Sequence, residues 1–539
     1  METDLGIIEG HGGDVALAAL RAAGVAEMFT LSGGHVFPMY DAAVRQEMRI
    51  VDVRHEQTAT FAAEGTAKLT RRPGLAVVTA GPGVTNSVSA VTSAYFTGVP
   101  LIVLGGRAPT VNWGRGGLQE LDHVPILAPV TKLSRTATTG DDIGPVLLEA
   151  ATTALSPHRG PVFVDVPMDT IFSPASASIS FSPPAPVDPD PAAVAEVAGL
   201  IASASRPAFI VGGDVWFGRA EQALARAAAA LDVPVFMNGM GRGVLPADDP
   251  RAFSRVRSLL RKEADLVVVI GTPLDFRLAF GDFGSASVVH LADSAAGVAT
   301  HRELAGSASG DLGLILDGLA AVAASHEPWL TRLREAETAA RAADSGVLDG
   351  GGSVISPASV YGALRSRLAR DAVVIGDGGD FVSYAGKYVD SYQPGCWLDP
   401  GPYGCLGTGL GYAMAARLAR PSAQVVLLLG DGAAGFSLMD VDTLVRHDLP
   451  VVMVVGNNGA WGLEKHPMRQ IYGYDVAAEL RPETRYDEVV RALGGAGETV
   501  RSPADLGAAL DRAFASGVPY LVNVLTDPDD AYPRSSVLA

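Results

Sequence analysis

Short, almost wholly apolar runs recur along the chain, separated by longer segments with helical spacing. Two of them, Val425 to Leu429 and Val451 to Val455, lead into glycine and then into oxygen-bearing side chains, Asp431 after the first and Asn458 after the second. Strands that are buried on both faces of a parallel sheet have this pattern. A helix-like segment at 438–449 lies between the two runs, so the pattern predicts a β-α-β unit.

The alternation of strand-like and helix-like segments extends over the whole chain. It predicts the α/β class, with three successive doubly wound parallel-sheet domains. Two stretches interrupt the alternation and are interpreted as linkers: the serine- and proline-rich residues 173–191, and residues 336–357, which run from a charged helix into a glycine cluster. The predicted domains are residues 1–172, 190–335 and 355–539. The other predicted strands are 50–54, 75–79, 100–105, 161–167, 207–213, 234–239, 265–271, 372–378 and 520–526.

Composition narrows the classes of partner. The 539 residues include 41 Lys and Arg against 59 Asp and Glu, a formal net charge of −18, which disfavours nucleic acid and anionic membranes as partners. Two cysteines provide neither a disulfide framework nor a metal quartet and suit a reducing compartment. The first residues lack the features of a signal peptide, and no apolar run reaches the ~18 residues of a membrane span. We therefore expect a cytoplasmic enzyme that acts on a small molecule.

The two strand ends predict a magnesium site. Asp431 and Asn458 are 27 residues apart, about what one helix and two short loops need to connect adjacent parallel strands. Open α/β sheets bind ligands at the carboxyl ends of their strands. The carboxylate of Asp431, the amide oxygen of Asn458 and a backbone carbonyl nearby, assigned to Ala460, are oxygen ligands of the kind that Mg²⁺ shares with a bound phosphate. The competing interpretation is a pair of polar strand ends that close ordinary turns.

This GDG…NN pattern resembles the thiamin-diphosphate signature of the acetolactate synthase and pyruvate decarboxylase superfamily, over the whole chain. The resemblance implies the thiamin-diphosphate-binding fold, in the order pyrimidine-binding, central and diphosphate-binding domain. It also implies a homodimer or homotetramer, because the cofactor lies between the first domain of one subunit and the third domain of another. The cofactor contacts that it implies in the third domain are Gly379, Asp380, Phe381, Leu406, Gly430, Asp431, Gly432, Ala433, Asn458, Ala460, Trp461 and Gly462.

Two of these positions need comment. In the segment PGPYGCLGTGLGYAMAARLA, Leu406 takes the place of the bulky apolar residue that forces the two cofactor rings into a V. Asp380, in GDGGDF, brings a like charge towards the diphosphate. Either its side chain turns away or the alignment is off by one residue.

In the first domain, the segment RHEQTATFAAEGTAK resembles the one that holds the activating glutamate, which falls on Glu56. A glutamic acid that is hydrogen-bonded to the aminopyrimidine favours the imino form that removes the C2 proton of the cofactor. The competing interpretation is a glutamate at a helix start, favoured there by the helix dipole.

Four further residues are candidates for contact with the substrate. Gln119, in a loop similar to that of acetolactate synthases and 2-hydroxyacyl-CoA lyases, is assigned to the substrate carbonyl or hydroxyl, against a solvated loop amide. Glu464 is either a proton shuttle at the mouth of the site or an exposed partner of Lys465. His35 and His123 are candidate proton relays, and each is otherwise structural.

The substrate remains the open question. Segments such as 430–451 and 240–250 look closest to 2-hydroxyacyl-CoA lyase and oxalyl-CoA decarboxylase, while 457–468 resembles bacterial proteins labelled acetolactate synthase large subunit. We expect a 2-hydroxyacyl-CoA lyase that forms formyl-CoA and an aldehyde or ketone, with an acetolactate synthase that joins two pyruvates as the alternative. A catalytically silent protein with the same fold is a third possibility. The central domain is a candidate site for ADP, CoA or FAD, and the basic run 251–262 is either a contact for CoA phosphates or a solvated helix face.

Overall fold

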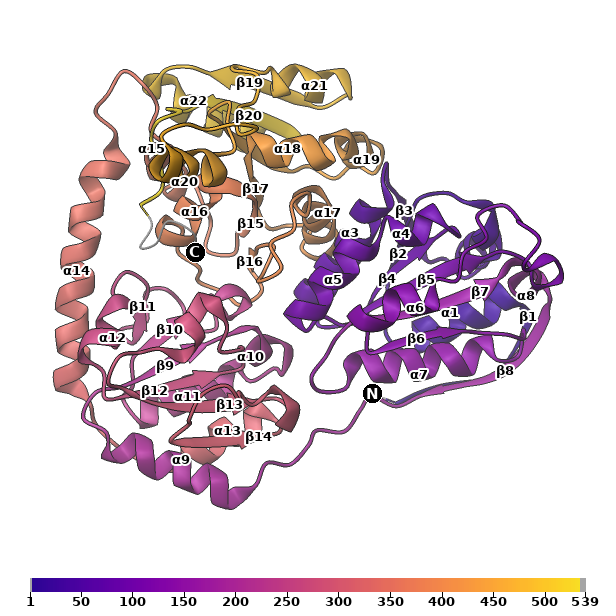
Figure 1. Cartoon of the computed structure of the whole chain (residues 1–539), viewed down its shortest axis with the longest axis horizontal. Helices are drawn as coiled ribbons and strands as arrows, with labels where there is room; N and C mark the ends of the chain where they lie inside the picture. Colours follow the sequence, from indigo (N-terminus) through magenta and orange to yellow (C-terminus); the bar gives the residue numbers. More distant parts are fainter. Residues whose placement is uncertain (1, 534–539) are drawn as a thin grey trace.

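The computed structural model describes residues 2–533 and divides the chain into three α/β units, each built on a six-stranded parallel sheet (Figure 1). The predicted fold class is therefore confirmed. Each predicted strand coincides with an observed one, because runs such as 425–429 are apolar at every position and are buried on both faces. The sequence analysis did not predict several strands that contain polar positions or have only two residues. Among them are β6 (Leu133–Thr136), β11 (Ala252–Phe253), β16 (Trp397–Leu398) and β19 (Ala496–Val500).

The sheet of the first unit has the order β3-β2-β4-β5-β7-β6. Successive residues of its strand β4 point to opposite faces, so that Leu75 packs with helices α1 (Gly12–Ala22) and α7 (Ile143–Leu155), while Ala76 packs with α3 (Glu56–Thr70) and α5 (Val88–Thr97). Helices thus cover both faces. Its strands are β2 (Glu27–Thr30), β3 (Arg49–Asp52), β4 (Gly74–Val78), β5 (Leu101–Arg107), β6 (Leu133–Thr136) and β7 (Val162–Pro167).

The first predicted linker is partly wrong. Residues Pro174–Phe181 form a strand, β8, that pairs antiparallel with β1 (Thr3–His11). The sequence PASASISF alternates, and Ala175, Ala177, Ile179 and Phe181 are buried while the serines between them are exposed. This period of two is a strand signal, which the serine content concealed.

The second unit has the strand order β11-β10-β9-β12-β13-β14. The 23-residue helix α14 (Glu327–Asp349) leaves it and runs along the edge of the molecule to the third unit (Figure 1). More than half of the second predicted linker is therefore helix. The strands are β9 (Pro207–Val211), β10 (Val235–Met237), β11 (Ala252–Phe253), β12 (Leu266–Ile270), β13 (Ser287–Ala292) and β14 (Gly306–Ser309).

The third unit has the strand order β16-β15-β17-β18-β20-β19. The predicted β-α-β unit is present, but its connection is broken into α18 (Asp431–Ser437), a 3₁₀ turn at Leu438–Asp440 and α19 (Val441–Arg446) rather than one helix over 438–449. The strands are β15 (Val373–Asp377), β16 (Trp397–Leu398), β17 (Val425–Gly430), β18 (Val452–Asn457), β19 (Ala496–Val500) and β20 (Tyr520–Leu525).

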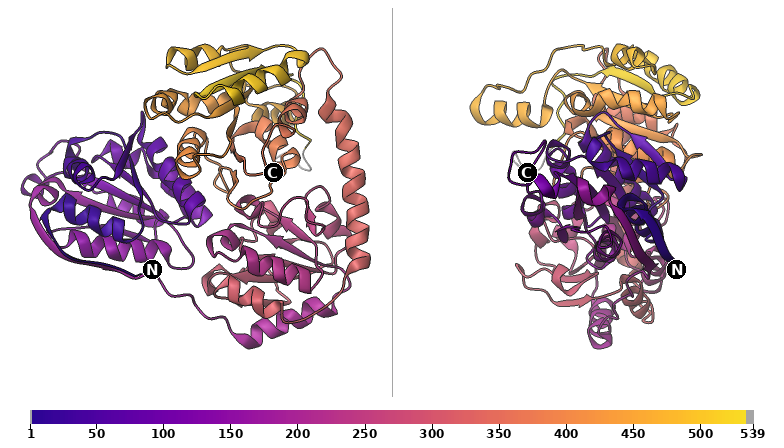
Figure 2. Two further views of the ribbon diagram at one scale, coloured as in Figure 1. Left: turned by 180° about the vertical axis from the view of Figure 1, so that it is seen from behind. Right: turned by 90° about the vertical axis from the view of Figure 1, so that its right-hand side faces the viewer.

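The first and third units meet through two helices, α3 and α17 (Gly409–Ala419), which lie side by side in both views of the ribbon (Figures 1 and 2). Glycine allows the close approach, since a Cβ on Gly65 would lie 2.9 Å from Cβ of Ala415, and one on Gly411 would lie 2.8 Å from the backbone of Ala62. This contact places the start of α3 beside the loop that precedes α17. Within residues 2–533, no helix has the length and apolar character that crossing a bilayer requires.

Candidate functional site

The carboxyl ends of β15 and β17 form a cradle of bare backbone. Gly378 and Gly379 follow β15 with φ of +68° and +84°, and a Cβ on Gly430, at the end of β17, would lie 3.2 Å from the carbonyl oxygen of Gly378. Helix α16 (Gly379–Tyr388) begins here, with its free N–H groups at this edge of the sheet. A glycine-lined helix start of this kind suits an anion such as a diphosphate.

Asp431 lies beside this cradle and is 3% exposed. Its two carboxylate oxygens accept hydrogen bonds from the backbone N–H of Gly432 (3.0 Å) and of Gly459 (2.7 Å). Burial raises the pKa of Asp431 to about 6, partly opposed by these bonds. No ion pair within residues 2–533 involves this carboxylate. A buried carboxylate with no cationic side chain beside it suits a metal ion.

The second predicted metal ligand, Asn458, lies at the same edge of the sheet as Asp431. Asn458 follows β18, the neighbour of β17 in the sheet, and its Oδ1 accepts a hydrogen bond from the N–H of Ala460 (3.1 Å). Because Asp431 binds the N–H of Gly459, the turn 458–460 is tied directly to the end of β17. The donor set of Asp431, Asn458 and the Ala460 carbonyl therefore comes from adjoining segments, as its use for Mg²⁺ requires.

The other third-domain candidates surround this turn. Trp461 covers Gly432, since a Cβ on Gly432 would lie 2.5 Å from the indole ring. Ala433 is buried beneath Gly378, and Gly462 begins α20 (Gly462–Tyr472).

Two candidates on α16 have side chains with partners inside the protein. Oδ2 of Asp380 accepts a hydrogen bond from the N–H of Tyr532 (2.9 Å), so the charge that stood out in the sequence is engaged with the C-terminal segment. The ring of Phe381 is buried against Gly456 in the core. The predicted cofactor contacts of both residues rest on their position on α16.

A cavity of about 510 Å³ opens beside the cradle. Leu406 and Trp461 lie in its wall, and so does the exposed Glu464. The second domain contributes Asn238, Phe276 and Arg277, which the sequence did not single out. Arg277 brings a positive charge, held by a two-pronged ion pair with Asp275.

Glu56 is the first residue of α3 and is 6% exposed. Its Oε2 accepts a hydrogen bond from Nδ2 of Asn86 (3.0 Å), and His55 caps the helix by accepting the N–H of Gln57. Gln57 in turn donates to the carbonyl oxygen of Leu406 (3.3 Å). The start of α3 is therefore connected to the loop that carries Leu406.

His35 and Gln119 share a partner in the first domain. Oγ1 of Thr79 lies 3.0 Å from Nδ1 of His35 and donates to Oε1 of Gln119 (3.3 Å). Burial lowers the pKa of His35, so the ring is neutral at physiological pH. Gln119 has a left-handed backbone with φ of +59°, a conformation that is uncommon for residues other than glycine and occurs at functional loops.

His123 is fully buried and has a structural environment. Its Nε2 accepts the backbone N–H of Gly81 (2.9 Å), and its Nδ1 lies 3.0 Å from Asp165. Because the backbone N–H can only donate, the ring must carry its proton on Nδ1, towards Asp165. Both ring nitrogens are therefore committed to the fold.

Within residues 2–533, the residues that form the two halves of the predicted site share no polar contact. No hydrogen bond or ion pair among residues 2–533 connects Glu56, His35 or Gln119 with Asp431 or Asn458. The start of α3 is instead bound to other parts of the third domain: Gln57 donates to the carbonyl oxygen of Leu406, and the N–H of Arg54 and the hydroxyl of Thr58 donate to the carboxylate of Asp440. Sequence reasoning missed Thr79 and Asn86, which lie in and just after the turn that follows β4.

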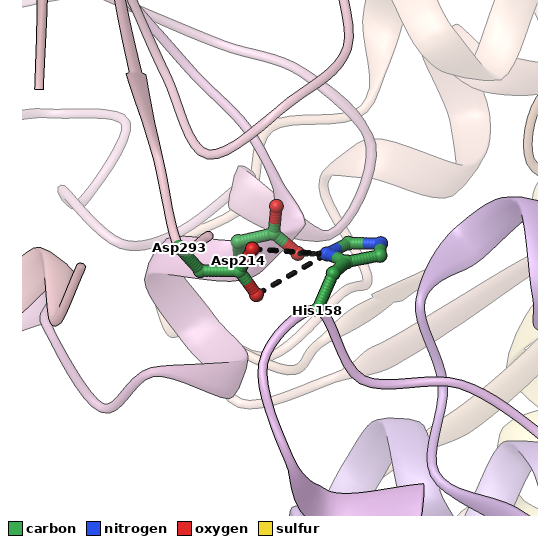
Figure 3. A group of neighbouring side chains, drawn as sticks. All are labelled: His158, Asp214 and Asp293. Carbon is green, nitrogen blue, oxygen red and sulfur yellow. Dashed lines mark hydrogen bonds and ion pairs between the residues drawn. The ribbon is translucent and has the colours of Figure 1, made fainter. Parts of the chain in front are cut away.

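A group of ion pairs lies at the carboxyl ends of two strands of the second domain, β9 and β13. Nδ1 of His158, from the first domain, lies 3.2 Å from both carboxylate oxygens of Asp293 and 3.7 Å from Asp214 of the second domain (Figure 3). The charge of Asp214, together with Asp293, raises the pKa of His158 to about 9, although burial and the ammonium of Lys132 oppose this. The charged ring thus joins the two domains.

This geometry predicts that alkali weakens the contact. The folded-state pKa of His158 lies above its ordinary 6.5, so the stabilisation is complete below about pH 6.5 and is lost as the pH rises through about 9. Urea unfolding of the wild type and of His158→Gln, measured from pH 6 to pH 10, is expected to show a stability difference that shrinks across this window. A difference that does not change with pH would contradict the assignment.

The basic run 251–262 is occupied by internal contacts. Arg251 pairs with Asp249, Arg255 with Asp344, and Arg261 with Asp282. Three of its four arginines therefore already have carboxylate partners, and the fourth, Arg257, donates to the carbonyl oxygen of Arg277 (3.0 Å). These internal contacts leave the run little capacity to bind the phosphates of CoA. The run is not one solvated helix face either, because only Ser258–Glu263 is helical and the side chain of Arg255 is buried.

Comparison with known proteins agrees with this geometry. Three family models match the chain: the N-terminal TPP binding domain of thiamine pyrophosphate enzymes at residues 10–126, the central domain at 194–319, and the C-terminal TPP binding domain at 325–524. "Probable acetolactate synthase" of Mycobacterium bovis and "Acetolactate synthase large subunit IlvG" of Mycobacterium tuberculosis are each 52% identical over 538 residues, 98% of this chain and 98% of the relative. "2-hydroxyacyl-CoA lyase 2" of Caenorhabditis elegans is 35% identical over 577 residues, 96% of this chain and 90% of the relative.

These matches correct the expected activity and confirm the expected family. The expected 2-hydroxyacyl-CoA lyase activity is wrong as the main assignment, because the full-length relatives at 52% identity carry the acetolactate synthase name and the lyases stand at about 35% or below. The matched domains, their order and the full-length relatives show that the chain belongs to the thiamine pyrophosphate enzyme family.

Proposed function

We propose that this chain is an acetolactate synthase, which joins two pyruvates to give 2-acetolactate and CO₂. The observation that carries the proposal is the 52% identity to acetolactate synthases over 98% of both chains. The cavity beside the cradle is compatible with such a small substrate, and Arg277 lies in its wall next to its partner Asp275. When bound, thiamin diphosphate supplies an electron sink for the carbon that loses CO₂.

The residues of the third domain fit the cofactor. The backbone N–H groups at Gly379 and Gly430 would hold the diphosphate, while Asp431, Asn458 and the carbonyl of Ala460 would hold Mg²⁺. Leu406 would support the cofactor rings from below, next to Gly378. A nucleotide at the central domain has less support, because Asp214 and Asp293 put two carboxylates at the strand ends where phosphates would bind.

We further propose a homodimer in which the first domain of one subunit completes the site of its partner. Glu56, Gln119 and His35 have no polar contact with Asp431 in their own chain among the described residues. Large exposed side chains gather near the same edge, where the rings of Phe96 and Tyr403 stack at 5.3 Å. A second copy would cover this apolar surface. Its exposed members are Tyr95 (42%), Phe96 (50%), Tyr403 (47%), Phe436 (56%) and Met439 (55%).

In this arrangement each polar group has a defined task. Glu56 would hydrogen-bond to the pyrimidine ring of the cofactor and so would favour the imino form that serves as the base. Gln119 donates an amide N–H to the carbonyl oxygen of the substrate, and Glu464, at the mouth, exchanges a proton with the product hydroxyl. His35 is neutral and orients Thr79 and Gln119 rather than carrying charge.

The proposal is tested with the purified protein, thiamin diphosphate and Mg²⁺. Pyruvate is expected to give acetolactate and CO₂ in a ratio of one to one, and omission of the cofactor is expected to stop the reaction. A 2-hydroxyacyl-CoA serves as the second substrate in a parallel assay. Release of formyl-CoA without acetolactate from pyruvate would overturn the proposal, and no turnover of either substrate would indicate a catalytically silent protein.

A further inference from the structure

Asp377 is the last residue of β15 and lies directly before the glycines of the cradle. It is fully buried, and its two carboxylate oxygens accept hydrogen bonds from the backbone N–H of Gly407 (3.0 Å) and of Gly409 (2.8 Å). Within residues 2–533 it forms no ion pair. Burial raises its pKa to about 7, against the opposing effect of these hydrogen bonds. A buried carboxylate without a countercharge lowers the stability of the fold unless its hydrogen bonds, here to the loop, compensate for the loss of water.

The loop needs this anchor because helix α17 has no cap of its own. Thr408 precedes the helix with helical backbone angles, and its side chain makes no capping hydrogen bond. Asp377 takes over that role from a distant strand, since it accepts the N–H of Gly409, the first residue of α17. Glycine is required there, because a Cβ on Gly409 would lie 2.9 Å from the carboxylate.

The same anchor fixes Leu406. The side chain of Leu406 rests on Gly378, the residue after Asp377, where a Cβ would lie only 2.1 Å from Cδ2 of Leu406. On the other side, the carbonyl oxygen of Leu406 accepts a hydrogen bond from Gln57, the neighbour of Glu56. The loop is therefore held from below by Asp377, and it spans the gap between the cradle and the start of α3.

We propose that Asp377 is a positioning residue, which holds the loop 405–409 so that Leu406 stays over Gly378 at the wall of the cavity. It acts through Leu406 and does not touch the substrate. This inference rests on the proposed function only where it connects Leu406 to catalysis. The anchoring itself is a property of the protein without cofactor, and it can be tested separately.

Cys405 provides a direct reporter of the loop. It is half-buried next to Leu406, its Sγ lies 3.5 Å from the carbonyl oxygen of Ser89, and burial raises the pKa of its thiol to about 12. An anchored loop should therefore make this thiol slow to react. In Asp377→Asn, one of the two N–H groups loses its acceptor, because the amide nitrogen can only donate. The rate of Cys405 alkylation, located by peptide mass spectrometry in the cofactor-free protein, is expected to rise about tenfold.

A matched control separates anchoring from general loosening. Asp487, on α21 (Tyr486–Ala492), is also fully buried in the third domain and accepts hydrogen bonds from Arg485 and Thr499. Asp487→Asn is expected to leave Cys405 alkylation at the wild-type rate. An unchanged rate in Asp377→Asn, or an equal rise in both variants, would overturn the proposal.

A separate measurement tests whether Asp377 affects catalysis. At saturating cofactor, the kcat of Asp377→Asn with pyruvate is expected to fall about a hundredfold, since a small displacement of a supporting group has effects of this size, while KM changes little. Faster alkylation with an unchanged kcat would keep the anchor but remove its role in positioning. If the wild type makes no acetolactate, the alkylation result still decides the anchor.

Hydrogen exchange of the wild-type protein covers the case in which Asp377→Asn does not fold. The amide of Gly407 lies in the loop and that of Gly409 at the first position of α17, where no helical acceptor is available, yet their hydrogen bonds to a buried carboxylate should protect them as strand amides are protected. Rapid exchange of the peptide that contains these two amides would overturn the anchor without any substitution.

Discussion

Replacement of Glu56 by Gln is expected to lower kcat with pyruvate by about a thousandfold, the size of effect typical when a proton-transfer group is removed. The amide keeps the size of the side chain and its contact with Asn86, but it has no acidic proton to give to the pyrimidine ring. Glu56 is 6% exposed at the first position of α3, so water cannot readily take over its task. The measurement is steady-state turnover at saturating thiamin diphosphate and Mg²⁺.

The control is another glutamate of the same domain. Burial raises the pKa of Glu27, which lies on β2 and accepts a hydrogen bond from Thr66 of α3. Glu27→Gln therefore removes a partly buried carboxylate that contacts the same helix, yet it is expected to retain turnover near the wild-type value. A Glu56→Gln variant that binds the cofactor and turns over at the wild-type rate would remove Glu56 from the mechanism.

The dimer adds a second expectation to this experiment. If Glu56 serves the site of the partner, a heterodimer of Glu56→Gln and Asp431→Asn subunits contains one intact site, whereas either homodimer contains none. Mixing the two inactive variants should then restore part of the activity. No recovery despite subunit exchange would place Glu56 in the site of its own chain.

The sequence predicted that Asp431 and Asn458 lie close together because the signal for this is local. Asp431 and Asn458 each follow an apolar strand, and parallel pairing alone brings the ends of β17 and β18 together. Nothing more than the strand order was needed to expect that the two residues adjoin. The same reasoning predicted a place for Glu464 at the mouth, because it lies only a few residues past Asn458.

Other parts depend on contacts that no local pattern encodes. Asp377 looks like an ordinary strand end until the structure brings Gly407 and Gly409 over it. His123 resembles a proton relay until both of its ring nitrogens are seen to be bound inside the fold. Arg277 reaches the cavity only through the packing of the central domain against the third. Each case requires a distance between residues that are far apart in the chain.

The substrate assignment failed for a different reason. The resemblance of segments such as 430–451 pointed to the superfamily but did not determine the substrate. Identity over the whole length separates synthases from lyases, at 52% against 35%. Fold and cofactor were therefore accessible from motifs, whereas the choice of substrate was not.

The largest loss of stability is expected from a substitution of Lys68, a residue of α3 whose side chain is fully buried against α17. Its ammonium is 2.9 Å from Oε1 of Glu64 and donates to the hydroxyl of Tyr412 (2.7 Å), which in turn donates to the second oxygen of Glu64 (2.9 Å). Lys68→Met leaves the carboxylate of Glu64 without its countercharge, and breaking a buried pair in this way costs about 3–5 kcal/mol. Urea unfolding at neutral pH measures the loss.

Two comparisons show whether the loss comes from the unpaired charge. Arg226 and Asp317 form an exposed pair at 2.6 Å, and Arg226→Met is expected to cost at most about 1 kcal/mol, because water solvates the remaining charge. The double variant Lys68→Met with Glu64→Gln should recover much of the loss, since Ser93 and Thr97 can still donate to the amide oxygen that replaces Oε1. A Lys68→Met variant no less stable than Arg226→Met would show that the α3–α17 contact tolerates a buried unpaired carboxylate. The same interface positions Glu56 and Leu406 at its ends, so kcat should recover together with stability in the double variant.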